Sequence, residues 1–311
     1  MRNAFVRELT SIAAGDPNTI LITGDLGFGV LTDFARQYPR QYLNAGVAEQ
    51  NMTALAVGLA LEGKTVYTYS IANFPTLRCL EQIRNDACYH RANVKIVSIG
   101  GGFAYGALGI SHHATEDLAI MRALPNMTVF SPGDPAEVRW ITRMAHGTSG
   151  ACYLRLGKGG EPAVHAGEID LSMGSLLPIH PDGEVVILST GGILPVAAAA
   201  REELIRRNVP AALFSLPTLK PFPRVQVAEL ATTRRLIVTI EEHSISGGLG
   251  GSVAEVVAEA PHRGARLLRC GLADKFYSTV GNQDFLRAEA GLTPQAIAER
   301  VIAHRRTTTS E

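Results

Sequence analysis

The sequence lacks the cysteine patterns and the long apolar segments that mark several classes of protein. Its four cysteines form no C-x-x-C pair and lie far apart, at Cys79, Cys88, Cys152 and Cys270. This spacing indicates neither a zinc ribbon nor a disulfide framework, and free thiols are typical of a reducing cytoplasm. No apolar run approaches the roughly 18 residues of a membrane-spanning helix, and residues 1–16 carry charges where a signal peptide has its apolar core. We therefore expect a soluble, cytoplasmic protein with no membrane partner.

The chain also lacks an excess of charge of either sign. Its 29 lysine and arginine residues balance 29 aspartate and glutamate residues in a total length of 311. A balanced chain has no net field to attract nucleic acid or an anionic membrane surface. We expect no nucleic-acid partner, and any ligand must be held by a local site.

What the sequence does contain is an alternation of short β-branched runs with helical patterns. Strands are expected at residues 19–23, 65–70, 94–100, 127–132, 184–192, 211–217, 234–242 and 265–272, with helices between them, including 44–63 and 76–91. Such alternation is typical of βαβ units that form a mainly parallel sheet with helices on both faces. A stretch rich in glycine and charge interrupts the pattern after residue 157. The predicted fold class is α/β, with two doubly wound, mainly parallel-sheet domains at 1–160 and 182–311 joined by a linker at 161–181.

One acidic residue, Glu49, stands out in the segment 44–63, which reads NAGVAEQNMTALAVGLALEG. An acid in the first turn of a helix commonly accepts hydrogen bonds from the free backbone N–H groups there. Here the helix that follows is apolar on nearly every face, and Asn44 and Gly46 let the backbone approach closely just before the acid. Two interpretations stay open: a helix cap, or a buried acid that shares a proton with a nitrogen atom of a ligand.

The motif NAGVAEQNM resembles the glutamate motif of the pyrimidine-binding domain in thiamine-diphosphate enzymes of the transketolase and deoxyxylulose-phosphate synthase group. The resemblance continues in register through YSIANFPTLRCLEQIRNDACY, NVKIVSIGGGFAYGALGISHHATEDLAIMRALPNMTVFSPGDPAE and EEHSISGGLGGSVAEVV, and covers nearly the whole chain. It implies a pyrimidine-binding domain followed by the transketolase C-terminal domain. In this family the glutamate that matches Glu49 hydrogen-bonds the aminopyrimidine of the cofactor and favours its imino tautomer. The resemblance therefore implies a catalytic and cofactor-binding role for Glu49.

The resemblance also implies roles for three other residues near the cofactor. Phe74 matches the aromatic residue that stacks on the aminopyrimidine, although an ordinary core phenylalanine fits the position too. His112 matches a histidine that points at a substrate oxygen and can move a proton near neutral pH. Asp25 matches an aspartate near the cofactor pocket, with a turn residue at a strand end as the alternative. The spacing of His112 and Glu116 is compatible with a metal pair, but no third ligand is evident, and no metal site is predicted.

Three further positions bear on the substrate. Four residues before the histidine the family has an aspartate that reads a sugar hydroxyl, and this chain has Leu108, which accepts no hydrogen bond. The departure indicates a specialised substrate, such as a deoxy or branched sugar. At the phosphate end, YLRLGKGG resembles the strand end that grips the sugar phosphate, with Arg155 and Lys158 as candidates. Lys158 falls on the position where the family usually has arginine. Its ammonium is a point charge, whereas a guanidinium could bind a phosphate through two N–H groups at once.

A segment that the resemblance leads one to expect is missing. The family holds the diphosphate and Mg²⁺ through a G-D-G segment of a separate domain, and this sequence contains no G-D-G. The resemblance therefore implies the C-terminal half of a split transketolase. An N-terminal, diphosphate-binding subunit would hold the diphosphate of thiamine diphosphate and its magnesium. Because the family's cofactor lies where the two kinds of domain meet, we expect a heterotetramer of two copies of this chain and two partner chains.

The sequence thus predicts a subunit of a transferase of carbohydrate metabolism that moves a two-carbon ketol unit from a ketose, expected to be a sugar phosphate, to an aldehyde. Related alternatives are the beta subunit of a 2-oxoacid dehydrogenase and a decarboxylating enzyme like deoxyxylulose-phosphate synthase. The segment SHHATEDLAIMRALPNM favours the transketolase branch. An alternative of another class is a non-catalytic regulatory subunit, which the joint presence of Glu49, Phe74 and His112 disfavours.

Overall fold

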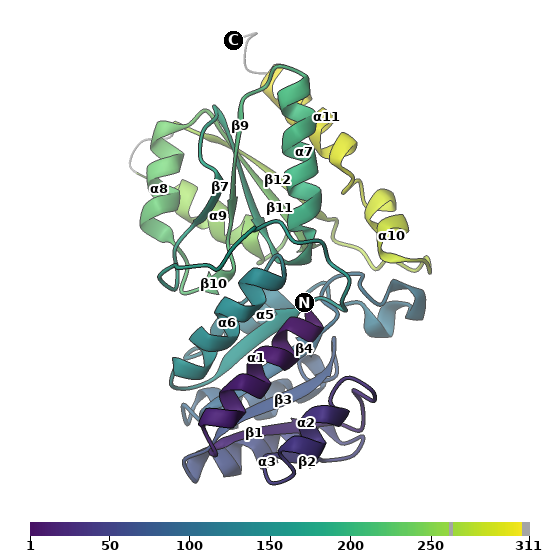
Figure 1. Cartoon of the computed structure of the whole chain (residues 1–311). Coiled ribbons are helices and arrows are strands. Elements are labelled where there is room, and N and C mark those ends of the chain that lie inside the picture. Colours follow the sequence, from purple (N-terminus) through teal and green to yellow (C-terminus); the bar gives the residue numbers. More distant parts are fainter. Residues whose placement is uncertain (261–263, 307–311) are drawn as a thin grey trace.

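The computed structural model describes residues 1–260 and 264–306 of the chain. Two twisted sheets organise these residues, one in the lower and one in the upper half of Figure 1. Both sheets are parallel except at one edge strand each, where β10 pairs with β5 and β7 pairs with β9 in the antiparallel sense. Helices cover both faces of each sheet, which confirms the predicted α/β fold class.

The first sheet has the strand order β10-β5-β6-β4-β3-β1-β2. Its strands are β1 (Thr19–Thr23), β2 (Tyr42–Asn44), β3 (Thr65–Ile71), β4 (Val94–Ile99), β5 (Thr128–Phe130), β6 (Cys152–Leu156) and β10 (Thr218–Lys220). The helices around it are α1 (Arg2–Gly15), α2 (Thr32–Gln37), α3 (Glu49–Leu61), α5 (Asp117–Ala123) and α6 (Pro135–Gly147).

Successive strand residues of this sheet are buried on opposite faces. Leu21 and Leu154 pack in the same apolar cluster as Trp140 of α6, whereas their neighbours Ile22 and Tyr153 pack in another cluster that includes residues of α3 and α5. Side chains alternate across a strand, so a sheet covered on both sides needs apolar residues at every position. This explains why the strands read as continuous apolar runs.

The second sheet has the order β12-β11-β8-β9-β7. Its strands are β7 (Leu177–His180), β8 (Val185–Thr190), β9 (Ala211–Ser215), β11 (Leu236–Ser244) and β12 (Arg266–Leu272). Its helices are α7 (Leu194–Arg206), α8 (Arg224–Thr233), α9 (Leu249–Glu259), α10 (Gln283–Glu289) and α11 (Pro294–Arg306). In Figure 1, α8 and α9 lie on one side of this sheet and α7 and α11 on the other.

The segment expected as one helix at 76–91 is a succession of three short helical types. A 3₁₀ turn η1 (Leu77–Cys79) leads into α4 (Leu80–Gln82), and a π-helical stretch η2 (Ile83–Cys88) follows. Each change of type alters the rotation per residue, so the side chains do not follow a single 3.6-residue period. The helical character was predicted correctly, but the direction in which each side chain points was not predictable.

The two halves of the chain are joined by backbone pairing and by a buried acid. Strand β10, which the sequence places inside the second domain, adds to the edge of the first sheet, with Thr218 opposite Phe130. Glu242 of β11 accepts a hydrogen bond from the backbone N–H of Phe103 at 2.6 Å and forms an ion pair with Arg287. The halves therefore share a sheet and a buried polar contact.

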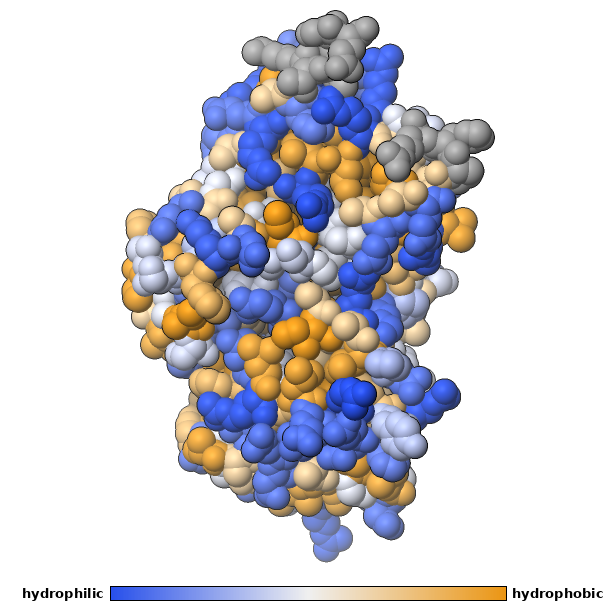
Figure 2. Space-filling model, turned by 180° about the vertical axis from the view of Figure 1, so that it is seen from behind, coloured by the Kyte–Doolittle hydropathy of each residue, from blue (hydrophilic) through white to orange (hydrophobic). Residues whose placement is uncertain are grey.

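The outer surface carries apolar side chains among its charges. Figure 2 shows, from behind, an apolar patch just below the middle of the molecule and another near its upper end. Among the described residues no helix is both long and apolar enough to cross a membrane. Exposed apolar side chains that are gathered together commonly mark contact surfaces between proteins.

Candidate functional site

The predicted site residues follow the carboxyl ends of parallel strands in the first sheet. Asp25 comes after β1, Phe74 after β3, and the loop of 100–113 after β4. Because the strands are parallel, these segments all lie at the carboxyl ends of the strands. Open α/β sheets bind their ligands at this end. The predicted residues are thereby brought to one end of the first unit.

Glu49 is the first residue of α3 and is almost fully buried, at 3% exposure. Its Oε2 accepts a hydrogen bond from Nη1 of Arg78 at 2.8 Å. Ala48 occupies the N-cap position, and within the described residues no side chain caps this helix. The Glu49 carboxylate thus does not cap the helix. Its hydrogen-bond partner is Arg78, from the segment after β3.

Glycines allow the backbone to close around this acid. A methyl group on Gly24 would lie 3.5 Å from Cγ of Glu49 and 3.4 Å from the carbonyl oxygen of Gly46. Gly46 itself has a φ of 74°, a conformation that costs glycine little and other residues considerably more. The backbone conformation at position 46 thus explains why the residue there is a glycine, as the sequence suggested.

Arg78 is a residue that sequence reasoning missed. Its guanidinium carbon lies 4.6 Å from the ring centroid of Phe74, so the cation contacts both the acid and the aromatic ring. Arg78 belongs to the 3₁₀ turn η1, where a regular helical period does not apply. Only the proximity of a basic residue to Phe74 in the sequence could have drawn attention to it.

Phe74 links the acid to the histidine. Its ring is half-buried and meets the ring of His112 edge to face, at 5.2 Å between centroids. Beyond His112 lies Tyr105 at 6.3 Å, and the ammonium of Lys158 lies 5.1 Å from the Tyr105 ring. We call this continuous series of contacts the site row; its members are Glu49, Arg78, Phe74, His112, Tyr105 and Lys158.

Two histidines in succession have different surroundings. Nδ1 of His112 lies 3.0 Å from the Ser111 hydroxyl, and the ring is partly exposed. His113 is buried at 4% exposure and packs edge to face on Phe103, while its carbonyl oxygen accepts a hydrogen bond from Asn73. Burial lowers the pKa of His113 and so favours its neutral form. His113 thus anchors the loop that presents His112.

Asp25 lies in an exposed turn after β1. Its φ is 57°, its N–H donates to Oδ1 of Asn44, and its own Oδ1 accepts from Nδ2 of Asn44. Asn44 Oδ1 also accepts the N–H of Gly46. Asp25 and Asn44 thus hold together the turns that follow β1 and β2, and a contact of Asp25 with the cofactor stays a prediction.

Of the substrate candidates, Leu108 and Lys158 are open to solvent. Leu108 is 57% exposed in the turn η3 (Gly106–Leu108), beside the turn η4 (Ile110–His112) that carries the histidine. Lys158 is exposed after the end of β6. Both side chains lie on the same loops as the site row and are accessible to a ligand.

Arg155, the other candidate for a substrate phosphate, is a buried residue. It is 4% exposed, and its Nε donates to Oδ2 of Asp117 at 2.8 Å. Its Nη2 donates to the carbonyl oxygens of Ala114 and Glu242. Nε and Nη2 of Arg155 thus bond within the protein, between the two halves, and Lys158 is the more exposed of the two cations. A contact of Arg155 with a substrate phosphate stays a prediction.

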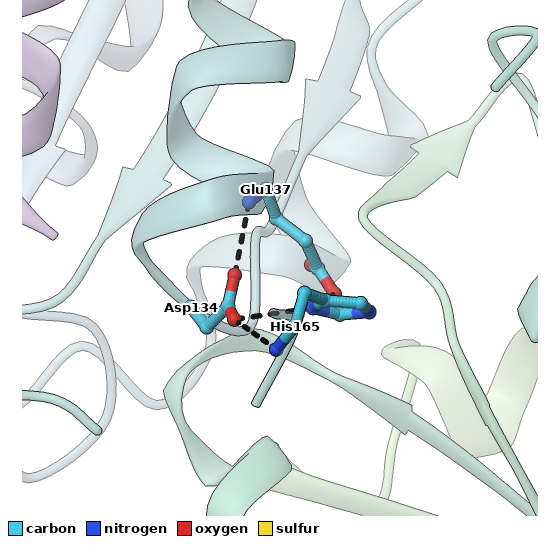
Figure 3. Close-up of side chains that lie close together, drawn as sticks. All are labelled: Asp134, Glu137 and His165. Carbon is cyan, nitrogen blue, oxygen red and sulfur yellow. Dashed lines mark hydrogen bonds and ion pairs between the residues drawn. The ribbon is translucent and has the colours of Figure 1, made fainter. Parts of the chain in front are cut away.

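A separate cluster of possible metal ligands lies at the start of α6 (Figure 3). Oxygen and nitrogen atoms of Asp134, Glu137 and His165 all lie within 4.8 Å of one another. Asp134 Oδ1 accepts the N–H groups of Ala136 and Glu137, and Oδ2 accepts those of Val164 and His165 and lies 3.1 Å from His165 Nδ1. Because both oxygens already accept N–H donors, the cluster fits a helix cap that fastens the segment after β6.

The charges of this cluster depend on one another. Burial would raise the pKa of Asp134, but hydrogen bonds from His165 and from backbone N–H groups hold it well below its ordinary value. Burial raises the pKa of Glu137 to about 7. Burial lowers the pKa of His165, but its hydrogen bond with Asp134 and the nearby Glu137 charge outweigh burial and raise it. His165 therefore holds a proton beside Asp134 more tightly than an exposed histidine does, and Glu137 holds its proton more tightly than an exposed glutamate does.

Comparison with known families gives two matches that together span most of the chain. The model of the transketolase pyrimidine-binding domain matches residues 1–161, and that of the transketolase C-terminal domain matches residues 174–297. Both domains were expected from the sequence. Residues 162–173, which lie between the two matched ranges, belong to the segment between β6 and β7.

Individual proteins agree with the family matches. The chain is 30% identical to an apulose-4-phosphate transketolase subunit of Actinobacillus succinogenes, over 97% of each chain. It is 32% identical to a 6-deoxy-6-sulfo-D-fructose transketolase subunit of a Clostridium species, over 96% of this chain and 92% of that one. Among solved structures, a split-gene transketolase described as an inactive beta4 tetramer superposes with a TM-score of 0.86 at 34% identity, covering 97% and 96% of the two chains.

Proposed function

The chain belongs to the transketolase family, as the C-terminal section of a split enzyme, and we propose that it becomes an active transferase only with a diphosphate-binding partner chain. The family uses thiamine diphosphate. The reaction is the transfer of a two-carbon ketol unit from a ketose to an aldehyde acceptor. The observation that carries this proposal is the site row, in which Glu49, Phe74 and His112 are connected by direct contacts through Arg78.

The residues of this chain fit the aminopyrimidine end of the cofactor. Glu49 offers a buried carboxylate that already accepts an N–H donor, and Phe74 offers a half-buried ring face beside it. A Cβ on Gly24 would lie 3.5 Å from Cγ of Glu49, so glycine at this position keeps the space beside that side chain open. When bound, thiamine diphosphate supplies a carbon nucleophile and an electron sink, which no protein side chain can provide.

Each member of the site row has a distinct task in this proposal. Glu49 hydrogen-bonds a ring nitrogen of the aminopyrimidine and thereby selects its tautomer. Phe74 stacks on the ring and keeps water away from that face. His112 lies at the Phe74 edge, so that its nitrogen can donate a proton to a substrate oxygen or accept one from it.

The partner completes the site from the exposed side of these loops. Phe28, in the loop that follows Asp25, is 80% exposed, and Val47, in the loop that precedes Glu49, is 74% exposed. Apolar side chains exposed in this way are suited to a protein interface. The solved relative that forms an inactive beta4 tetramer supports a need for another kind of chain. We propose that the partner holds the diphosphate and Mg²⁺ in a heterotetramer of two chains of each kind.

The substrate is a ketose with an anionic end. Lys158 supplies a positive charge at the end of the site row, and the names of two relatives specify a phosphorylated and a sulfonated ketose. Leu108 offers an apolar surface where a hydroxyl-reading acid was expected. We propose a sugar that lacks, or does not present, a hydroxyl group at that point.

Calorimetry tests the proposal directly. Thiamine diphosphate with Mg²⁺ is titrated into this protein alone and into a mixture with the chain encoded beside it. We expect binding only in the mixture, followed by ketol transfer in a screen of anionic ketoses. Tight binding by the lone protein would show that the partner requirement is wrong, and absence of binding in both would contradict the cofactor assignment.

Two alternative functions are separated by simple variants and acceptors. A regulatory subunit would keep the activity of its assembly after Glu49→Ala, whereas we expect a loss of about 10²-fold or more, because this acid controls proton transfer at the cofactor. Glu62, an exposed acid after the same helix, serves as the matched control through Glu62→Ala. A 2-oxoacid dehydrogenase subunit would acylate a lipoyl domain, and we expect no such product.

A further inference from the structure

We propose that Arg78 is a place-holder for the cofactor's aminopyrimidine: it occupies Glu49 and Phe74 while the site is empty and moves away when the cofactor binds. The inference rests on the proposed function, which assigns these two contacts to the pyrimidine ring. It adds a second state of the same site, in which a residue of this chain satisfies both groups.

The contacts of Arg78 coincide with those proposed for the cofactor. Its Nη1 donates to Glu49 Oε2 at 2.8 Å while its guanidinium carbon lies over the Phe74 ring at 4.6 Å. Since Arg78 touches the ring and the carboxylate together, it lies on the ring face that is turned toward Glu49. A pyrimidine that stacks on that face and reaches the same carboxylate must take the place of the guanidinium.

The chemistry of the two groups is similar. A guanidinium is planar, presents N–H donors in its plane and stacks on aromatic faces. An aminopyrimidine is also a flat nitrogen-rich group that donates a hydrogen bond to a carboxylate in its plane. Each can therefore satisfy a buried acid and an aromatic face at the same time.

The burial of Glu49 explains why a place-holder is needed. The carboxylate is 3% exposed, and a buried charge without a partner is strongly unfavourable. The Arg78 side chain, in contrast, is 47% exposed. It extends from a three-residue 3₁₀ turn, and its head group has solvent into which it can move. The acid is thus held in place by a partner that can leave.

Thermal stability and cofactor affinity of the reconstituted complex test this inference. Arg78→Ala removes the place-holder and is compared with Arg84→Ala, which removes an exposed arginine of the adjacent π-helical stretch whose Nη1 bonds only its neighbour Asn85. We expect Arg78→Ala to bind thiamine diphosphate about 5-fold more tightly, because the competing contact is gone, a change of about 1 kcal/mol. We expect Arg84→Ala to bind as the unchanged complex does.

A linkage measurement gives a second and independent readout. Arg78→Ala should lower the melting temperature of the complex without cofactor and leave that of the saturated complex nearly unchanged, because the place-holder acts only in the empty site. Arg78→Gln, which keeps a polar side chain near Glu49, should change both quantities in the same direction but less.

The opposite results have distinct meanings. Weaker cofactor binding by Arg78→Ala, or equal destabilisation with and without cofactor, would overturn the place-holder role and make Arg78 a cofactor ligand or a plain structural ion pair. If the unchanged complex did not bind thiamine diphosphate at all, the proposed function would fail, and the place-holder role would fail with it.

Discussion

At the scale of single residues, the site combines positions that a motif can identify with positions that it cannot. Glu49, Phe74 and His112 were predicted from their motifs, and in the structure contacts with Arg78 and between the two rings connect them. Arg78 and Tyr105 were not found, because each joins the others through a loop conformation that no motif describes. Arg155 was predicted to contact the substrate from its place at a strand end, and the sequence could not show that its Nε and Nη2 bond within the protein.

Leu108 offers a prediction of substrate choice. Replacing it in Leu108→Asp places a hydrogen-bond acceptor four residues before His112, where it can accept from a sugar hydroxyl. We expect kcat/KM of the reconstituted complex to shift by at least 10-fold toward ketoses that carry a free hydroxyl there, because an unpaired polar group is costly in a closed site. The measurement is the ratio of kcat/KM for a pair of ketoses that differ in that hydroxyl.

The matched control is Leu108→Asn, which accepts a hydrogen bond without the negative charge. A similar shift in both variants would assign the effect to hydrogen bonding. If neither variant altered the ratio, Leu108 would lie outside the substrate pocket, and the substrate part of the proposed function would need another residue.

At the scale of elements, the apolar runs predicted the main strands well because both faces of each sheet are buried. The strand expected at 94–100 is β4 at Val94–Ile99, and that at 19–23 is β1 at Thr19–Thr23. The segment 76–91 was less predictable, since its helical type changes twice within twelve residues (Leu77 to Cys88). That irregular segment is also the one that brings Arg78 to Glu49.

The start of α6 predicts a pH dependence of stability. Burial raises the pKa of Glu137 to about 7, above the value near 4.5 of an unfolded glutamate. The folded protein therefore binds this proton more tightly, so the stabilisation is complete below pH 4.5 and is lost as the pH rises toward 7. In Glu137→Gln, which cannot ionise, we expect this loss to shrink by up to about 3 kcal/mol.

Urea unfolding between pH 4.5 and 7.5 measures this effect. Some dependence on pH remains in the variant, since burial also raises the pKa of Glu241 to about 7 and acts in the same direction. Glu62→Gln, at an exposed acid, is the control and should show the slope of the unchanged protein. An equal slope in Glu137→Gln would mean that Glu137 is charged throughout this range.

At the scale of the whole molecule, the two halves are expected to unfold together. Glu242 accepts from the backbone N–H of Phe103 in the first half and pairs with Arg287 in the second, and it is 3% exposed. In Glu242→Ala the buried N–H and the guanidinium lose their acceptor, which typically costs about 3–5 kcal/mol for one broken buried pair. We expect one cooperative transition at a clearly lower temperature.

Differential scanning calorimetry checks this expectation, with Glu184→Ala as a control at an exposed ion pair with Arg305. Two separate transitions in the variant would show instead that Glu242 is the main coupling between the halves. A melting temperature equal to that of the unchanged protein would contradict its structural role.

Composition alone could predict only in part which residues belong to which sheet. The glycine- and charge-rich stretch after residue 157 lies between β6 of the first sheet, which ends at Leu156, and β7 of the second, which begins at Leu177. It could not reveal β10, because a strand of three residues carries no periodic signal and its partner β5 lies about 90 residues earlier.

The position of β10 has a consequence for anyone who recombines these proteins. The backbone N–H of Ser131 donates to the carbonyl oxygen of Pro217, and Nζ of Lys220 donates to the carbonyl oxygens of Arg122 and Leu124. A chimaera that exchanges the second half for that of a relative also exchanges the edge strand of the first sheet. Such a hybrid should therefore keep residues 217–220 from the parent that supplies β5, while the rest of the second half comes from the other parent.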